Sequence, residues 1–193
     1  MEQELFDLLS ALEMQHEKEK TRRTANGIDA LNPDAAKFIS MFALAKKAQV
    51  MVDIGSGVGY STLWLAYAAS KTGGKVIACE LDAARATQLQ ANLAKAQLTN
   101  YVEVLVGDAR AMLRNRTETV DLLLIDGDRG QYETYFDVVY KQMEVGGTVI
   151  ADDVVTEENS LSDYVSYMQN HPNLESLTLP IGDGLEVTVK IKN

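Results

Sequence analysis

Residues 50–61 read VMVDIGSGVGYS, and this stretch decides the fold. The apolar run that ends at Ile54 has the length of a buried strand, and three glycines follow it in G-x-G-x-G spacing. Glycine adopts the positive φ angles of a tight turn and lets the backbone approach a ligand closely. A helix is predicted to begin at Tyr60, and a helix start presents free N–H groups to a bound molecule. Strand, turn and helix in this order predict the ligand-binding rim of an α/β sheet.

Strand and helix patterns alternate from this stretch to the end of the chain. The predicted strands are Val50–Ile54, Lys75–Cys79, Val102–Val106, Val120–Ile125, Thr148–Ala151, Leu174–Leu179 and Leu185–Ile191. Continuous apolar runs such as 121–125 indicate strands that are buried on both faces, as in a parallel sheet covered by helices. The last two strands flank a glycine-rich turn and suggest an antiparallel edge. We therefore expect a Rossmann-like three-layer α/β sandwich, with a mostly parallel seven-stranded sheet and an antiparallel C-terminal strand.

The chain is predicted to form a single domain, residues 1–193, in which residues 1–31 are an N-terminal helical segment. Its 193 residues are 46% hydrophobic and 24% charged, which is typical of a globular domain with a sizeable core. The N-terminal segment carries leucines at helical spacing, and a polar stretch from Glu17 to Thr24 is expected to be a solvated helix end or loop. The two histidines, His16 and His171, are expected at the surface, although His16, near the end of the first helix, could instead reach the mouth of a binding site.

The charge and the cysteine content narrow the expected partners and location. The net charge of −10 repels phosphate backbones, so nucleic acid is not an expected partner. No apolar run is long enough to span a bilayer, and the acidic N-terminus does not resemble a signal peptide. The single cysteine, Cys79, cannot form a disulfide within the chain, which agrees with a reducing compartment. We expect a cytoplasmic protein without membrane partners.

The spacing of the glycines favours one class of cofactor. A dinucleotide turn has G-x-G-x-x-G spacing and would place glycine at position 60, where this chain has Tyr60. The spacing found here, which ends at Gly59, suits a ligand without phosphates, such as S-adenosylmethionine. Glu80 ends the second strand and can accept hydrogen bonds from ribose hydroxyls. Asp108 follows the third strand, where its carboxylate could bind the adenine amino group, cap a helix, or do both.

Acidic residues follow the fourth and fifth strands. Asp126 lies in the sequence DGDR, and Asp152 and Asp153 follow the next strand. Because the carboxyl ends of parallel strands meet at one rim, these carboxylates should converge and repel one another. A divalent cation such as Mg²⁺, Mn²⁺ or Ca²⁺ would relieve the repulsion, since these ions prefer oxygen ligands. The alternative is that the acids are helix caps exposed to water.

Together these motifs resemble the metal-dependent S-adenosylmethionine O-methyltransferases, the family of the catechol and caffeoyl-CoA O-methyltransferases. The resemblance runs from about residue 32 to the end, through VDIGSGVGYSTLWLA, CELD, VGDARAML, LLLIDGDRGQY, GGTVIADDVV and LPIGDGLEV. It implies that Asp126, Asp152 and Asp153 hold the metal and that Asp126 and Arg129 serve catalysis. The implied cofactor-binding residues are Asp53, Gly55, Ser56, Gly57, Gly59, Tyr60, Ser61, Glu80, Leu81, Gly107, Asp108, Ala109 and Asp126.

The chain departs from this family at two positions of the acidic rim. The family usually has asparagine where this chain has Asp153, and a lysine proposed as the base where it has Arg129. Arginine stays protonated in proteins, so Arg129 cannot accept a proton. It could pair with a substrate anion or form a surface ion pair, and the metal could replace the base for an acidic hydroxyl.

We therefore expect an S-adenosylmethionine-dependent O-methyltransferase that uses a divalent metal to methylate a hydroxyl of a small catechol-like or vicinal-diol substrate. The alternatives are a metal-independent methyltransferase and a non-catalytic S-adenosylmethionine- or nucleotide-binding module. Family relatives that methylate transfer RNA are disfavoured by the charge. Because relatives often pair, a homodimer is included among the expected assemblies.

Overall fold

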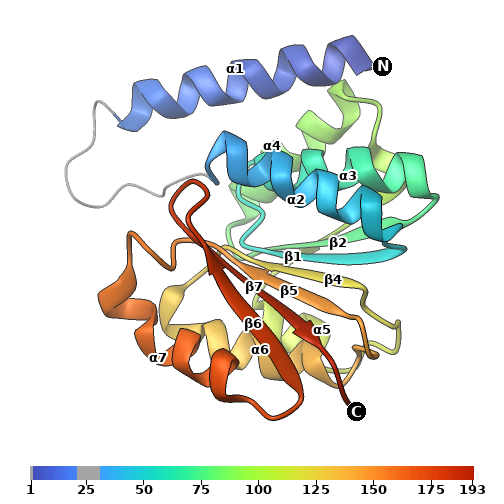
Figure 1. Cartoon of the computed structure of the whole chain (residues 1–193). Coiled ribbons are helices and arrows are strands. Elements are labelled where there is room, and N and C mark those ends of the chain that lie inside the picture. The colour runs from blue at the N-terminus through green and yellow to red at the C-terminus, as the bar shows by residue number, and fades with distance from the viewer. Residues whose placement is uncertain (1, 21–30) are drawn as a thin grey trace.

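A computed structural model describes residues 2–20 and 31–193 and contains one seven-stranded sheet with the order β3-β2-β1-β4-β5-β7-β6 (Figure 1). The strands are β1 (Val50–Ile54), β2 (Lys75–Glu80), β3 (Val102–Val106), β4 (Leu122–Ile125), β5 (Thr148–Ala151), β6 (Leu174–Leu179) and β7 (Leu185–Lys190). Strands β1 to β5 pair in parallel, and β7 is inserted antiparallel between β5 and β6. The prediction of a mostly parallel sheet with an antiparallel C-terminal strand is confirmed.

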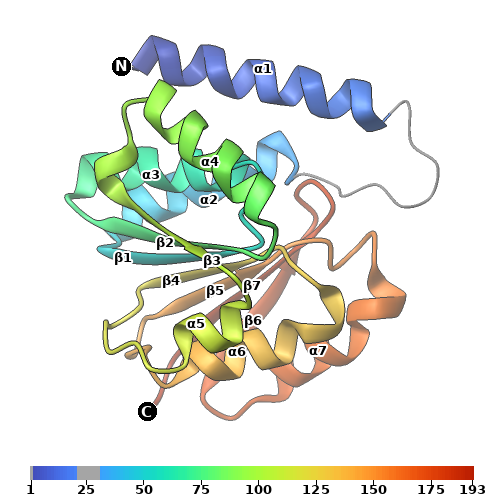
Figure 2. The ribbon, with the colours of Figure 1, turned by 180° about the vertical axis from the view of Figure 1, so that it is seen from behind.

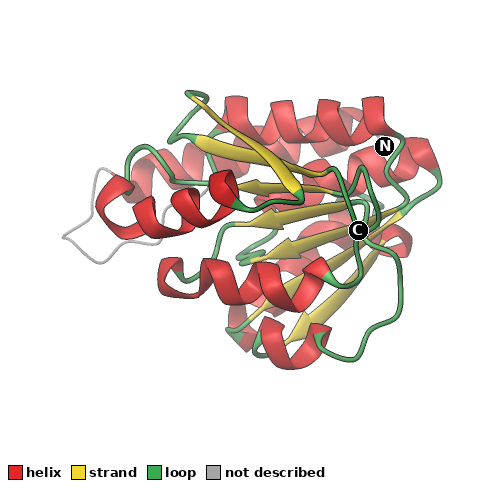
Figure 3. Cartoon of the chain, turned by 60° about the horizontal axis from the view of Figure 1, so that its bottom comes forward, coloured by secondary structure: helices red, strands yellow, loops and turns green. Residues whose placement is uncertain are grey.

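Helices cover both faces of the sheet, which gives the predicted three layers (Figures 2 and 3). The helices are α1 (Glu2–Lys20), α2 (Pro33–Lys46), α3 (Tyr60–Thr72), α4 (Ala83–Lys95), α5 (Ala109–Leu113), α6 (Tyr132–Tyr140) and α7 (Glu158–Asn170), with 3₁₀ turns η1 (Thr99–Tyr101) and η2 (Arg129–Gln131). Helices α2 to α4 lie on one face and α5 to α7 on the other. Among the described residues, no helix is long and apolar enough to cross a membrane.

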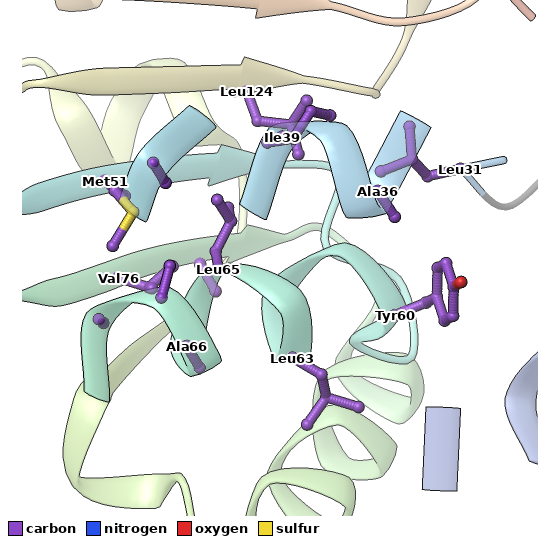
Figure 4. Close-up of a cluster of buried hydrophobic side chains, with 14 of the residues drawn as sticks. Leu31, Ala36, Ile39, Met51, Tyr60, Leu63, Leu65, Ala66, Val76 and Leu124 are labelled. Carbon is purple, nitrogen blue, oxygen red and sulfur yellow. The ribbon is translucent and has the colours of Figure 1, made fainter. Parts of the chain in front are cut away.

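The central strands β1, β4 and β5 are buried on both faces, as the continuous apolar runs predicted. Met51 of β1 joins Ile39 and Leu65 in the core beneath α2 and α3 (Figure 4). Its neighbour Val52 points to the opposite face, where it joins the core that includes Phe136 of α6. Successive residues of a strand point to opposite faces, so an apolar residue at every position fills two cores at once.

Helix α1 forms an additional layer outside α3 and α4 (Figures 1 and 2). Leu5 and Leu9 are buried, and Phe6 packs edge-on against Trp64 and Tyr67 of α3. The helix continues to residue 20, beyond the last of its leucines. The rest of the polar stretch, residues 21–24, lies outside the described residues. The N-terminal helix is thus held by an apolar face, as its leucine spacing predicted.

Candidate active site

The glycine turn lies directly against the acidic rim. Gly55, Gly57 and Gly59 all have positive φ angles, as predicted for this turn. A Cβ atom on Gly55 would stand only 2.0 Å from the carbonyl oxygen of Asp126, so only glycine fits this contact. The end of β1 and the end of β4 therefore meet here without any intervening side chain.

Asp53 supports the turn from below. Its carboxylate is fully buried and accepts hydrogen bonds from Ser61 Oγ at 2.9 Å and Thr62 Oγ1 at 2.6 Å. Burial raises the pKa of Asp53 to about 6, although the two hydroxyl donors oppose this shift. Both donors belong to the first turn of α3, so Asp53 fixes the start of this helix relative to β1. The implied role of Asp53 in supporting the loop agrees with this geometry.

Glu80 joins the glycine turn to the start of α4. Its Oε2 atom accepts a hydrogen bond of 2.7 Å from the amide of Gly57, and Oε1 accepts one of 2.8 Å from the amide of Asp82. Arg85 forms an ion pair with Oε1 at 3.1 Å. The Glu80 side chain is only 3% exposed, yet it borders a cavity, so its carboxylate is held in a fixed orientation at the strand end. Leu81, directly after it, is 73% exposed.

Asp108 caps α5 and is at the same time held by a neighbouring arginine. It accepts a hydrogen bond from the amide of Arg110 at 2.9 Å, and the guanidinium Nη2 of Arg110 lies 2.6 Å from its Oδ2. These hydrogen bonds with Arg110 lower the pKa of Asp108 to about 2. Arg110 also donates to Gln131 Oε1 at 2.6 Å. Asp108 therefore caps a helix, as one interpretation of the sequence predicted. Arg110 and Gln131 also line the cavity, and the sequence did not identify them as site residues.

A cavity of about 810 Å³ opens at the carboxyl ends of the parallel strands. The predicted site residues that line it are Gly55, Ser56, Gly57, Tyr60, Ser61, Glu80, Leu81, Gly107, Asp108, Ala109, Asp126, Arg129 and Asp153. The other predicted site residues, Asp53, Gly59 and Asp152, are described by the structure but do not line the cavity. The cofactor end and the acidic end of the predicted site therefore share one cavity, whose size lies within the range of ligand sites.

Helix α1 also contributes to the cavity wall, a position that the sequence left open for His16 and did not indicate for Glu13. Glu13 and His16 line the cavity, and the hydroxyl of Tyr60 donates a hydrogen bond of 2.6 Å to Oε1 of Glu13. His16 is partly covered at the cavity, which is the alternative to its expected surface position. The sequence does contain a pattern that indicates this placement. Leu9, Glu13 and His16 follow one another at helical spacing and therefore lie on the same inward face of the helix.

The three predicted metal ligands lie at the ends of the neighbouring strands β4 and β5. Asp152 and Asp153 are 2% and 7% exposed, and Asp126 is partly exposed to the cavity. Burial raises the pKa of Asp126 well above its usual range, the charges of Asp152 and Asp153 raise it further, and Arg129 opposes this. Asp128 has a different role from these three residues. It caps η2, because its Oδ1 atom accepts a hydrogen bond of 3.1 Å from the amide of Gly130. The charges of Asp152 and Asp153 thus act on Asp126 across the two strand ends.

Arg129 lies against this acidic cluster. Its Nε and Nη2 atoms donate to Oδ2 of Asp153 at 3.1 and 2.7 Å, and Glu157 lies 3.6 Å from Nη2. Within residues 2–20 and 31–193, no group of three or more His, Cys, Asp or Glu residues is arranged as a metal-ligand set. Carboxylate oxygens are nevertheless the type of ligand that a divalent cation prefers.

A glycine turn, an acidic residue at the end of the second strand and a cavity at the carboxyl ends of parallel strands define a Rossmann-like cofactor-binding protein. Residues 52–154 match the family described as a methyltransferase domain, and the chain belongs to this family. The prediction that the chain is a methyltransferase is thereby confirmed at the level of the family.

Individual relatives agree with this assignment. The chain is 30% identical to a catechol O-methyltransferase of Niastella koreensis over 138 residues, which cover 69% of this chain and 62% of that protein. It is 25% identical to caffeoyl-CoA O-methyltransferase 2 of Populus trichocarpa over 203 residues, covering 93% of this chain and 82% of that protein. The fold matches a solved O-methyltransferase from Bacillus cereus in complex with SAH, with a TM-score of 0.80, 24% identity and coverage of 97% and 90% of the two chains.

Proposed function

We propose that this chain is an S-adenosylmethionine-dependent O-methyltransferase that acts, with a divalent cation, on a hydroxyl of a small catechol-like or vicinal-diol substrate. The observation that carries the proposal is the contact between Gly55 and the backbone of Asp126, which joins the cofactor turn to the acidic rim inside one cavity. A methyl donor on the turn and an acceptor oxygen at the rim would then be neighbours. Such positioning is a main source of catalysis in transfer reactions.

The glycine turn and Glu80 would hold the cofactor. The methionine part would rest on the turn of residues 55–61, and Glu80 would accept hydrogen bonds from the ribose hydroxyls. The adenine would lie between Leu81 and the segment 107–109. The sulfonium of the cofactor carries a positive charge, and the carboxylate of Asp126, which lines the same cavity, would stabilise that charge electrostatically.

Asp126, Asp152 and Asp153 are the residues that would hold the cation. A divalent cation, when bound, supplies a Lewis acid that lowers the pKa of a coordinated hydroxyl. A phenolic hydroxyl needs only about 4 kcal/mol of such stabilisation to ionise at neutral pH. Arg129 remains protonated and contributes a fixed positive charge, so it cannot act as a base.

Asp152 provides the most direct test of the proposed chemistry. Purified protein should transfer a labelled methyl group from S-adenosylmethionine to members of a catechol and vicinal-diol panel, and a chelator should abolish the transfer. Asp152→Asn should reduce the transfer at least about 100-fold while the affinity for S-adenosylhomocysteine stays within about threefold. Asp128→Asn is the matched control, because Asp128 lies on the same rim but caps η2. Absence of transfer to every diol would exclude the proposed activity.

A metal-independent methyltransferase is the second candidate, favoured by the Arg129–Asp153 ion pair, which already brings one cation to the rim. Transfer that persists undiminished in the presence of a chelator would establish this alternative.

Small molecules rather than nucleic acid are the proposed substrates, because the net charge of −10 opposes phosphate binding. A homodimer and a cytoplasmic location stay predictions.

A further inference from the structure

The β6–β7 hairpin turns its polar face toward α7 and its apolar face toward solvent. On the polar face Glu186 is fully buried, and it accepts hydrogen bonds from Ser176 Oγ at 2.6 Å and from Gln169 Nε2 of α7 at 3.0 Å. Thr188 is also fully buried on this face. An antiparallel ribbon ordinarily buries its apolar side chains and exposes its polar ones. The hairpin therefore has the opposite arrangement.

The apolar side chains of the hairpin point to the side of the sheet that carries α2. Leu177 of β6 pairs with Val187 of β7, and Leu177 is 63% exposed. Val187 and Leu179 are only partly buried and pack against the core beneath α2. Figure 1 shows the hairpin at the front of the molecule, and among the described residues no helix lies over it there. The hairpin thus presents apolar side chains to solvent.

Helix α2 lies beside the hairpin along its whole length. Asn32, at the start of the helix, lies against Gly182 in the hairpin turn. At the other end of the helix, Lys46 donates a hydrogen bond to the carbonyl oxygen of Gly146, and the amide of Gly146 donates to the carbonyl oxygen of Lys190 in β7. The start of α2 is therefore at the hairpin turn, and its end is at the end of β7.

The outward side of α2 extends the apolar surface. The rings of Phe38 and Phe42 lie 6.1 Å apart and are only partly buried, and Met41 is 61% exposed. Both phenylalanines pack against the same core as the hairpin residues. Single exposed apolar residues are common in proteins, whereas a contiguous apolar area marks an interaction surface. We define the apolar face as Phe38, Met41, Phe42, Leu177, Leu179 and Val187.

Two exposed charges of opposite sign lie at diagonally opposite corners of the apolar face. Lys37 lies near the start of α2, at the end of the face that holds the hairpin turn. Glu175 lies near the start of β6, opposite Val189, at the far end. Within residues 2–20 and 31–193, neither side chain forms an ion pair. A two-fold rotation about the other diagonal brings two copies of the face together and places each lysine opposite a glutamate.

We propose that two copies of this chain associate through the apolar face in a two-fold dimer, in which Lys37 pairs with Glu175 of the partner subunit. Burial of the apolar side chains drives the association, and the two ion pairs fix its register. No residue of the apolar face lines the cavity, so the dimer is independent of the proposed methyl transfer.

The first test is sedimentation equilibrium of the purified full chain at micromolar concentration, which should give twice the mass of the chain. Leu177→Lys places a charge within the interface and should raise the dissociation constant of the dimer at least about 100-fold. Its circular dichroism spectrum should match that of the unmodified chain, because Leu177 is exposed in the monomer. Met14→Lys is the matched control, since Met14 of α1 is 61% exposed and the charge change is equal. It should keep the dissociation constant within about threefold.

The second test separates this two-fold interface from any other mode of self-association. Lys37→Glu and Glu175→Lys each place like charges opposite one another twice, so each variant alone should dimerise at least about tenfold more weakly. An equimolar mixture of the two variants restores both attractive pairs, and it should form a heterodimer within about threefold of the unmodified affinity. A monomer at every concentration, a dimer that Leu177→Lys leaves intact, or a mixture that stays monomeric would each overturn the proposal.

Discussion

The hydroxyl of Tyr60 donates a hydrogen bond of 2.6 Å to Oε1 of Glu13, and this bond ties α1 to the helix that follows the glycine turn. Tyr60 is the residue that stands where a dinucleotide turn would have its third glycine. Its ring extends from the start of α3 at the edge of the core (Figure 4). Burial, assisted by the carboxylate of Glu13, raises the pKa of Tyr60, so the phenol keeps its proton and remains the donor. The cofactor turn and the N-terminal helix are therefore coupled.

Removal of this hydrogen bond should weaken cofactor binding. Tyr60→Phe leaves the carboxylate of Glu13 without this donor at the cavity wall, at a cost of about 1 to 2 kcal/mol. We expect the affinity for S-adenosylhomocysteine, measured by calorimetry, to fall about five- to 30-fold. Glu13→Gln is the matched control, because glutamine still offers an acceptor oxygen, and it should keep the affinity within about threefold. Unchanged affinity in Tyr60→Phe would show that α1 does not support the turn.

Glu80→Gln should impair the cofactor site without affecting the acidic rim. Glutamine has one acceptor oxygen where Glu80 uses two, for the amides of Gly57 and Asp82, and it loses the ion pair with Arg85. Lost charged hydrogen bonds cost about 1.5 to 3 kcal/mol, so the affinity for S-adenosylhomocysteine should fall by about 10- to 100-fold. Mn²⁺ binding should remain within about twofold. A parallel loss of Mn²⁺ affinity would instead indicate a general collapse of the strand ends.

Gly55→Ala should disturb both ends of the site, since the added methyl group would meet the carbonyl oxygen of Asp126. We expect binding of S-adenosylhomocysteine to fall at least about 100-fold and the melting temperature to drop, as for an overpacked contact. Gly73→Ala is a matched control, because Gly73 also has a positive φ angle but an added Cβ would meet nothing within 4 Å. It should cost about 1 kcal/mol of stability and leave ligand binding intact. Equal effects of the two variants would assign the defect to backbone strain alone.

The buried Asp53 should make stability depend on pH between about 4 and 6. Its pKa is about 6 in the folded chain and near 3.8 when unperturbed, so the folded chain retains the proton more tightly within this window. The contribution of Asp53 to stability therefore falls as the pH rises from about 4 to 6, by about 3 kcal/mol in total.

Asp53→Asn removes this titration and keeps an oxygen for Ser61 and Thr62 to donate to. Its free energy of unfolding in urea, relative to the unmodified chain, should rise between pH 4 and 6 and stay level above pH 7. Asp163→Asn, at an exposed position of α7, should show no such slope. A relative stability of Asp53→Asn that is independent of pH would contradict the buried, proton-retaining carboxyl.

The glycine turn and the end of the second strand were largely predictable from the sequence. The turn at Gly55 depends on local backbone freedom, and the strand end at Glu80 depends on the alternation of apolar runs, so a short window of sequence specifies each. The strand boundaries were less accurate. Strand β4 begins at Leu122 rather than at Val120, because the ends of a strand depend on hydrogen bonds to neighbouring segments.

Side-chain partners required the tertiary structure. His171 was expected at the surface, yet its ring packs edge-on against Phe136, Tyr140 and Tyr167. Arg110 could have faced solvent, and instead it holds the carboxylate that was expected to meet adenine. Neither arrangement leaves a periodic signal in the sequence.

The sequence by itself determined the order of strands and helices, the glycine turn and the placement of three acids directly after two neighbouring strands, because hydrophobic period and strand polarity fix these locally. Only the tertiary structure decided that Arg129 pairs with Asp153 and that Glu13 reaches Tyr60. A charged side chain binds whichever opposite charge or donor the folded backbone brings within about 3 Å, and that distance is set by packing between segments far apart in the chain.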